Sequence, residues 1–198
     1  MLKGERQVQP TITTIATDHK SRYQWIASKL DKDDVVLDAC CGVGYGSYIL
    51  SEPANKVYAF DIDQDAIDWA IKYYDSSKIH YYCRNFTEFW VGNSVFSKIV
   101  CFEAIEHVEN PKLLLECFHD YLKPDGVLYI SSPNQTIIPF SKDNFPFHNR
   151  HWTPKEFENM LGNCGFKVNA WYSQRDKRST RFENHPFGRT MIAECGKI

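Results

Sequence analysis

Residues 35–47 constrain this chain more than any other segment, because an apolar, β-branched run leads directly into a glycine turn that opens a helix. The glycines, Gly42, Gly44 and Gly46, follow a G-x-G-x-G pattern. Such a turn lets the backbone approach a ligand, and the N-terminus of the next helix points its N–H groups into the same space. Asp61, nineteen residues after Gly42, ends a second apolar run. A carboxylate at this spacing can bind the two hydroxyls of an adenosine ribose, so the pair predicts an adenosine-containing cofactor.

The glycine turn also indicates which class of adenosine cofactor is bound. Its spacing departs from the dinucleotide pattern G-x-G-x-x-G, and an acid, Asp38, ends the preceding strand. A carboxylate there would repel a pyrophosphate but suits the amino group and sulfonium of S-adenosylmethionine. The segment resembles the first motif of the class I S-adenosylmethionine-dependent methyltransferases, "VLDxGCGxGxG". The resemblance implies cofactor contacts by Asp38, Cys40, Gly42, Gly44 and Asp61. A purely structural glycine turn and NAD binding remain the alternatives.

The rest of the chain alternates strand and helix patterns, which predicts an α/β fold. Strands are expected at 34–38, 56–60, 79–83, 98–102, 127–131, 167–172 and 190–195. Helices are expected at 18–30, 45–51, 64–74, 111–122 and from 154 to about 165, with Asp18, Asp63, Asn110 and Thr153 as N-caps and a turn at 124–126. The methyltransferase resemblance implies one Rossmann-like, doubly wound domain over residues 1–198. Its seven-stranded sheet is mainly parallel and ends in an antiparallel hairpin.

Composition fits one domain, because 198 residues with 43% hydrophobic residues can bury one core. Residues 1–17 are polar and are expected to form a flexible arm, and no 18-residue apolar span is present. The seven cysteines form no C-x-x-C pair. We therefore expect reduced thiols, a cytoplasmic setting and no membrane span. The oligomeric state is left open.

Three further cofactor contacts follow from the resemblance at the ends of the second and third strands. Ile62 is placed to pack on the adenine, although an apolar residue at a strand end can equally be core. Asn85 stands where the family commonly has an acid near the adenine amino group, and its amide oxygen can accept the same hydrogen bond. Phe86 follows it in the same turn.

The segment 103–107, Glu-Ala-Ile-Glu-His, carries the densest set of reactive groups and follows the fourth strand. In a helical turn, the i, i+3, i+4 spacing would point Glu103, Glu106 and His107 to one side. It resembles the E-x-x-E-H motif of ubiquinone-biosynthesis O-methyltransferases and of small-RNA 2′-O-methyltransferases. The latter resemblance implies Mg²⁺ completed by a later histidine, for which His148 and His151 are the candidates. Metal-free base catalysis by His107, a structural role and cofactor contact by Glu103 are also open.

Residues 133–152 form a long aperiodic segment, which predicts a substrate lid loop. Its aromatic residues either line the acceptor or pack over the sheet end; they are Phe140, Phe145, Phe147 and Trp152. Residues 142–198 hold ten basic against six acidic side chains, which indicates either a solvated hairpin tip or an anionic acceptor.

We therefore predict methyl transfer to a hydroxyl of a small molecule, glycan or nucleotide. No Asn-Pro-Pro-Tyr-type pocket follows the fourth strand, which argues against methylation of an exocyclic base amine, and a nucleic acid acceptor is possible but not favoured. The open alternatives are an RNA 2′-O-methyltransferase, an S-adenosylmethionine-binding lyase or sensor, and a non-catalytic interaction module.

Overall fold

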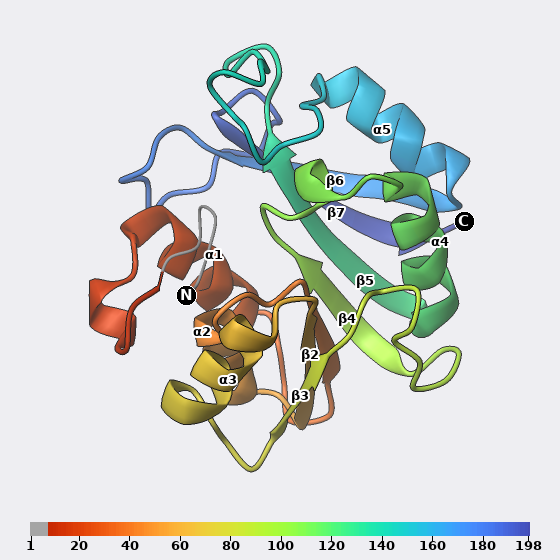
Figure 1. Ribbon diagram of the computed structural model, residues 1–198. Coiled ribbons are helices and arrows are strands. Elements are labelled where there is room, and N and C mark those ends of the chain that lie inside the picture. Colours follow the sequence, from red (N-terminus) through yellow and green to blue (C-terminus); the bar gives the residue numbers. More distant parts are fainter. Residues whose placement is uncertain (1–7) are drawn as a thin grey trace.

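Seven strands form a single sheet in the order β3-β2-β1-β4-β5-β7-β6 in the computed structural model, which describes residues 8–198 (Figure 1). The strands are β1 (Val35–Ala39), β2 (Lys56–Asp61), β3 (Ile79–Cys83), β4 (Phe96–Cys101), β5 (Leu122–Pro133), β6 (Phe166–Gln174) and β7 (Thr190–Lys197). Strands β1 to β5 pair in parallel, whereas β7 runs antiparallel to both β5 and β6. The predicted α/β sheet with its antiparallel C-terminal hairpin is confirmed.

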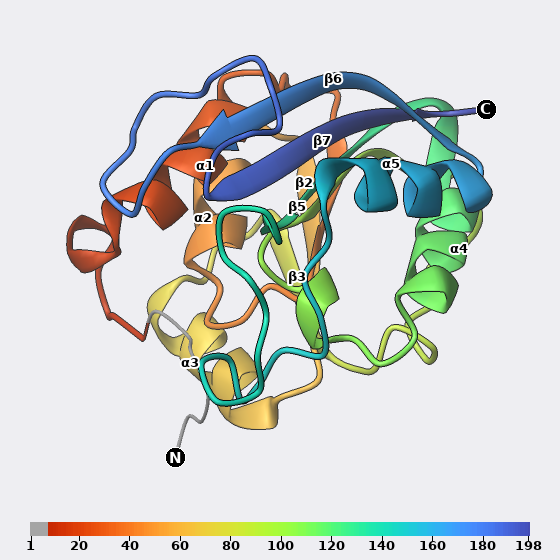
Figure 2. The same ribbon diagram turned by 90° about the horizontal axis from the view of Figure 1, so that it is seen from above.

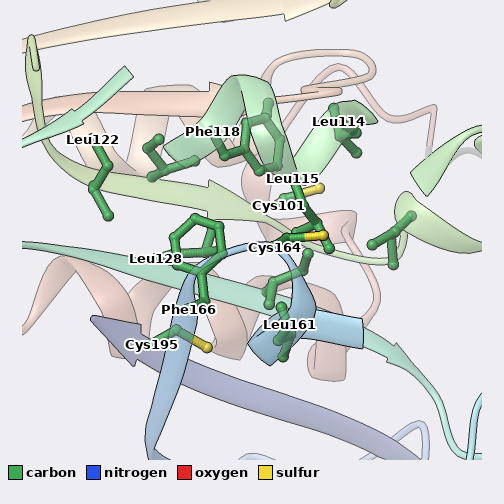
Figure 3. Packing of buried hydrophobic residues seen from close by; sticks show 14 of the residues in the cluster. Cys101, Leu114, Leu115, Phe118, Leu122, Leu128, Leu161, Cys164, Phe166 and Cys195 are labelled. Atoms are coloured by element: carbon green, nitrogen blue, oxygen red, sulfur yellow. The ribbon is translucent and has the colours of Figure 1, made fainter. Parts of the chain in front are cut away.

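Helices cover both faces of the sheet, as expected for a doubly wound fold (Figures 1 and 2). They are α1 (Thr17–Ala27), α2 (Tyr45–Ser51), α3 (Gln64–Tyr73), α4 (Pro111–Tyr121) and α5 (Pro154–Asn163), with short 3₁₀ turns η1 (Ile12–Thr14) and η2 (Ile105–His107). Buried side chains of α1, α2 and α3 form one hydrophobic cluster with the sheet, and those of α4 and α5 form the other. Figure 3 shows the second cluster, where Leu114, Phe118 and Leu161 meet strand residues such as Leu128.

Side-chain caps explain where three of the helices begin. Asp63 accepts a hydrogen bond from the Asp65 N–H at the start of α3, and Asn110 does the same for Leu113 at the start of α4. Thr153 and Glu156 form a reciprocal capping box at the start of α5. These three predicted caps are confirmed.

The prediction for α1 was wrong at both ends. The helix begins at Thr17 with Ala16 as its N-cap, so Asp18 lies inside the first turn, where its side chain is buried. It ends at Ala27 instead of Leu30 because Lys29 and Leu30 close tight i, i+3 turns after it.

The turn expected at 124–126 is instead a bulge inside β5. The pairing with β4 shifts from Phe96↔Leu122 to Lys98↔Val127, so the extra residues bulge out of the ladder. Gly126 allows this, because a Cβ at that position would lie 2.7 Å from the Leu122 side chain. Leu122 can therefore stay fully buried.

Part of the expected N-terminal arm packs against the domain. Residues 1–7 lie outside the described part of the chain. Beyond them, Ile15 is buried, and the Tyr74 hydroxyl donates to the carbonyl of Gln9. Among the described residues no helix is long and apolar enough to cross a membrane, and the seven cysteines are free thiols.

Candidate cofactor and acceptor site

Three acidic residues lie at the carboxyl edge of the parallel strands, where α/β sheets bind ligands. Asp38 is near the end of β1, Asp61 ends β2, and Glu103 follows β4. Since β1 pairs with both β2 and β4, the sheet brings these positions together. These three candidate residues therefore lie at the same ends of neighbouring strands, and their role in a shared site stays a prediction.

Asp61 holds the glycine turn in place. Its Oδ2 accepts a hydrogen bond of 2.8 Å from the Gly42 N–H, and its Oδ1 accepts one of 3.0 Å from the Asp63 N–H. Cys40 and Gly42 both have positive φ, 59° and 55°, which folds the backbone sharply between β1 and α2. A carboxylate offers about four acceptor sites, so one such group can accept several hydrogen bonds at once.

The glycines Gly44 and Gly46 also serve protein packing, and the predicted cofactor contact of Gly44 stays a prediction. A Cβ on Gly44 would lie 2.5 Å from the Cβ of Ala70, and φ there is 85°. A Cβ on Gly46 would lie 2.2 Å from the ring of Tyr23. These two glycines let α3 and α1 pack closely around the turn.

Asp38 is completely buried beneath the turn. Its two oxygens accept hydrogen bonds from the Tyr23 hydroxyl at 3.2 Å and from the Ser47 hydroxyl at 2.6 Å. Burial raises the pKa of Asp38 to about 7, against the lowering effect of these two donors, and the charge of Asp61 adds to the rise. A cationic group beside Asp38 would stabilise its ionised form.

Helix α1 contributes a buried cation that the sequence prediction did not assign to the site. Arg22 is only 1% exposed, and its Nη1 donates to Oε1 of Gln174 at 2.9 Å. Within the described part of the chain, its Nε and Nη2 have no hydrogen-bond partner. Its charge acts on His19 and Tyr45, and Tyr45 is the first residue of α2. Arg22 can therefore hold an anionic group near the glycine turn.

His19 lies beside the same turn, since its Nδ1 is 3.2 Å from the Tyr45 hydroxyl. Burial lowers the pKa of His19 to about 4, and the positive charge of Arg22 contributes.

The three adenine-side candidates occupy different surroundings. Ile62 is 67% exposed at the end of β2, so it is accessible to an adenine ring. The amide oxygen of Asn85 accepts from the backbone N–H and the hydroxyl of Thr87, which ties it into a local turn. Phe86 is partly buried against the core. Their cofactor contacts stay predictions, with Asn85 already engaged by the protein.

Glu103 occupies a strained position directly after β4. Its φ is 48°, in the left-handed region that non-glycine residues rarely adopt. The Ser131 hydroxyl accepts from the Glu103 N–H at 2.9 Å and donates to Glu103 Oε1 at 2.9 Å, which locks backbone and side chain together. Glu103 therefore points a fixed carboxylate toward β5 and β7.

Glu106, His107 and His148 form a second cluster, in which one ligand atom from each residue lies within 4.8 Å of the other two. Two of its members follow β4 in η2, and the third comes from the 133–152 loop. The rings of His107 and His148 meet edge to face, with centroids 4.5 Å apart. The expected meeting of β4 with a later histidine is therefore present, but Glu103 and His151 are not members of the cluster.

Backbone carbonyls set the protonation of these rings. A carbonyl can only accept, so His107 Nδ1–H donates to Phe147 and His151 Nδ1–H donates to Ile138, at 3.0 and 2.6 Å. His107 Nε2 is therefore in the acceptor form when the ring is neutral. His151 Nε2 in turn lies 2.7 Å from His148 Nδ1, so the Nδ1–H of His148 donates a hydrogen bond to Nε2 of a neutral His151. His151 therefore orients the ring of His148 and is one step removed from the cluster.

The donor set of one carboxylate and two imidazoles differs from the Mg²⁺ site that the resemblance implied. Mg²⁺ prefers oxygen ligands, whereas imidazole nitrogens suit ions such as Mn²⁺, Fe²⁺ or Zn²⁺. The residues therefore fit a divalent transition metal better than they fit magnesium.

The 133–152 loop is tied down at both ends. Asn134 donates through its side chain to the carbonyls of Pro186 and Gly188, and Asn149 N–H donates to the carbonyl of Glu106 at 2.7 Å. Trp152 is 1% exposed and packs against Phe157, so it is core and does not line an acceptor. Phe147, at 54% exposed, remains accessible. Closure of the middle of this loop stays a prediction.

A Rossmann-like sheet with a glycine turn, a ribose-spaced acid and polar groups after β4 defines the class of nucleotide-cofactor-binding α/β domains. A family model described as "Methyltransferase domain" matches residues 13–170. The chain belongs to this methyltransferase domain family.

Individual relatives agree with the family. A Mycolicibacterium smegmatis protein named "Probable S-adenosylmethionine-dependent methyltransferase" is 30% identical over 176 residues, which cover 84% of this chain and 65% of that protein. The ubiquinone biosynthesis O-methyltransferase of Actinobacillus pleuropneumoniae is 33% identical over 109 residues, 52% of this chain and 47% of the relative. The chain thus spans about half to two thirds of these relatives' length.

A solved structure shares the fold. The TehB-like SAM-dependent methyltransferase of Corynebacterium glutamicum superposes with a TM-score of 0.67 at 18% identity, over 90% of this chain and 88% of that one.

Proposed function

We propose that this chain binds S-adenosylmethionine at the carboxyl ends of β1 and β2 and transfers its methyl group to a hydroxyl oxygen. The observation that carries the transfer chemistry is His107, an exposed imidazole whose Nδ1–H is fixed on the Phe147 carbonyl and whose Nε2 can take a proton. It follows β4, the strand next to the cofactor strand β1.

The cofactor's parts match different groups of the site. Asp61 suits the ribose hydroxyls, and Ile62 is exposed where the adenine would lie. Asp38 suits the α-amino group, since its raised pKa marks a buried carboxyl that gains from a cation. Arg22 suits the α-carboxylate, because this group would satisfy its buried Nε–H and Nη2–H donors.

The transfer is an in-line displacement. The acceptor oxygen attacks the methyl carbon, the carbon–sulfur bond breaks, and sulfur keeps the electron pair to give S-adenosylhomocysteine. The hydroxyl proton passes to Nε2 of His107. Alignment of the oxygen within about 3–3.5 Å of the methyl is the main task of the protein, and the fixed His107 ring serves this alignment too.

A divalent metal ion would be held by Glu106, His107 and His148, with His151 orienting His148. When bound, it would lower the pKa of an adjacent acceptor hydroxyl, which supplies the same help that His107 supplies alone as a base. The two versions of the site use His107 differently, so they can be separated by experiment.

The test is transfer of a labelled methyl group from S-adenosylmethionine into acceptors of a cell extract. We expect label in a small-molecule fraction with the wild-type chain, and a loss of at least a hundredfold with His107→Ala. His80→Ala, which removes an exposed imidazole from β3, is the matched control and should keep its activity.

Chelation then separates the two versions. A reversible loss in excess chelator, restored by Mn²⁺, supports the metal; full activity in chelator leaves His107 as the base. An active His107→Ala chain would contradict both. Cofactor binding without label in any acceptor would instead indicate a sensor or a lyase.

A further inference from the structure

The loop between β6 and β7, residues 175–189, gathers an unusual positive charge. It holds five basic and two acidic residues in a chain whose net charge is −2. The basic residues are Arg175, Lys177, Arg178, Arg181 and Arg189. Within the described residues, none of these five side chains has an ion pair or donates a side-chain hydrogen bond, and the first four are exposed.

Hydrogen bonds anchor the loop to the rest of the domain in spite of this charge. Gln174, only 1% exposed, donates to the carbonyls of Asp18 and Ser179 and to the hydroxyl of Ser21. The backbones of Ser173 and Glu183 pair with each other through two hydrogen bonds. A loop that served only as a solvated tip would not need a buried glutamine to fasten it to α1.

These contacts fasten the loop at the edge of the site. Thr190, the first residue of β7, lies opposite both Gln174 and Pro133, so the loop emerges at the carboxyl end of β5. Thr190 Oγ1 is also 3.5 Å from Glu103 Oε2. Figures 1 and 2 both show the loop, in blue, beside α1.

The charge of the loop reaches into the site. His19 is held neutral chiefly by burial, and the positive charges of Arg22 and Lys177 lower its pKa further. His19 itself contacts Tyr45 at the start of α2. Lys177, one of the loop cations, therefore acts on a side chain that contacts the start of α2 beside the glycine turn.

We propose that the 175–189 loop binds phosphate groups of a low-molecular-weight methyl acceptor. This inference rests on the proposed function and adds the chemical class of the substrate. Four of the five cations are arginines, whose planar fork pairs with two phosphate oxygens at once. Several unpaired cations exceed what one carboxylate neutralises, so they fit an acceptor with more than one anionic oxygen group.

A nucleic acid fits less well. Recognition of a nucleic acid backbone uses a basic stripe or patch that follows successive phosphates. Here the surplus is confined to one loop, since the other residues of the chain carry more acidic than basic side chains. The loop therefore matches a compact phosphate-bearing molecule.

The test uses inorganic tripolyphosphate as the probe, titrated into the full chain by calorimetry with saturating S-adenosylhomocysteine. We expect saturable binding that weakens with added salt. Arg178→Ala/Arg181→Ala should weaken it at least tenfold. The matched control Lys32→Ala/Lys167→Ala removes two exposed cations near the amino-terminal ends of β1 and β6, away from the loop, and should change it less than twofold. Both variants should bind S-adenosylhomocysteine like the wild type.

Several results would overturn the inference. These are no tripolyphosphate binding at millimolar concentration, an equal loss in both double variants, or a single-stranded RNA 20-mer that binds a hundredfold more tightly than tripolyphosphate. If the wild type fails to bind S-adenosylhomocysteine, the cofactor assignment fails, but titration without it still tests the loop. In the labelling assay, phosphatase treatment of the extract should remove the methylated product, and unchanged labelling would also contradict the proposal.

Discussion

Gly46→Ala should destabilise the fold, although alanine is normally the better helix residue. Gly46 lies inside α2, and an added Cβ would sit 2.2–2.7 Å from three ring atoms of Tyr23. The ring cannot easily move, because it packs edge-on against Tyr45 and Phe102 and its hydroxyl donates to Asp38. The substitution therefore forces a shift in a tightly packed cluster.

The chain offers a matched control in Gly162→Ala. Gly162 lies in α5, and a Cβ there would meet nothing within 4 Å. Both substitutions gain up to about 1 kcal/mol of helix propensity. Overpacking at Gly46 costs about 1–3 kcal/mol in addition, and loss of the Tyr23 hydrogen bond to Asp38 about 1 kcal/mol more. We expect a net loss of about 1–3 kcal/mol for Gly46→Ala.

Thermal unfolding measures both variants. For a domain of this size about 1 kcal/mol shifts Tm by roughly 2–4 °C, so Gly46→Ala should fall by several degrees while Gly162→Ala stays level or rises. Adding Tyr23→Ala to Gly46→Ala should cost less than Tyr23→Ala costs in the wild type, since the ring that clashes is gone. A Tm for Gly46→Ala equal to that of Gly162→Ala would refute the packing argument.

Three other predictions concern the site. Because burial raises the folded-state pKa of Asp38 from 3.8 to about 7, its contribution to stability is full below pH 4 and is lost as the pH rises to 7. In urea unfolding at pH 5 and 7, the free energy of unfolding of Asp38→Asn should not show this loss. A pH dependence equal to that of the wild type would count against a raised pKa of Asp38. Arg22→Gln should weaken the binding of S-adenosylhomocysteine about tenfold or more. The affinity for 5′-methylthioadenosine, which lacks the carboxylate, should stay unchanged, and equal losses for both ligands would exclude a contact between Arg22 and the carboxylate. In hydrogen exchange, the hydrogen-bonded amides of Ile138, Phe145 and Asn149 should be protected without ligand. The amides of residues 141–143 and 147 should be protected only with cofactor and acceptor, so uniform slow exchange would argue against a lid.

Much of the fold could be predicted because each local signal agreed with the global pattern. The run into the glycine turn gave β1 and α2, and Asp63, Asn110 and Thr153 are caps that act on their own backbone. Such signals depend only on residues a few positions apart. The bulge in β5 could not be predicted, because it depends on the pairing of Leu122 with Phe96 across the sheet.

The site was predicted less completely for the same reason. Glu106, His107 and His148 could be nominated by residue type, but a helical turn was assumed for 103–107, and the left-handed backbone at Glu103 turns that carboxylate toward Ser131. Arg22 was missed because an arginine in a polar helix carries no signal until the fold buries it against Gln174. Tertiary contacts, which a single sequence does not display, decide both cases.

The most direct test of the account is calorimetric titration of S-adenosylhomocysteine into the wild-type chain, Asp61→Ala and Asp68→Ala. Asp61 is buried and holds the glycine turn, whereas Asp68 is an exposed aspartate of α3, so the two substitutions make the same chemical change in different places. We expect wild-type binding, a loss of about 2 kcal/mol or roughly thirtyfold for Asp61→Ala, and less than twofold for Asp68→Ala. Absence of binding by the wild type, or equal affinities in all three chains, would contradict the cofactor site on which the account rests.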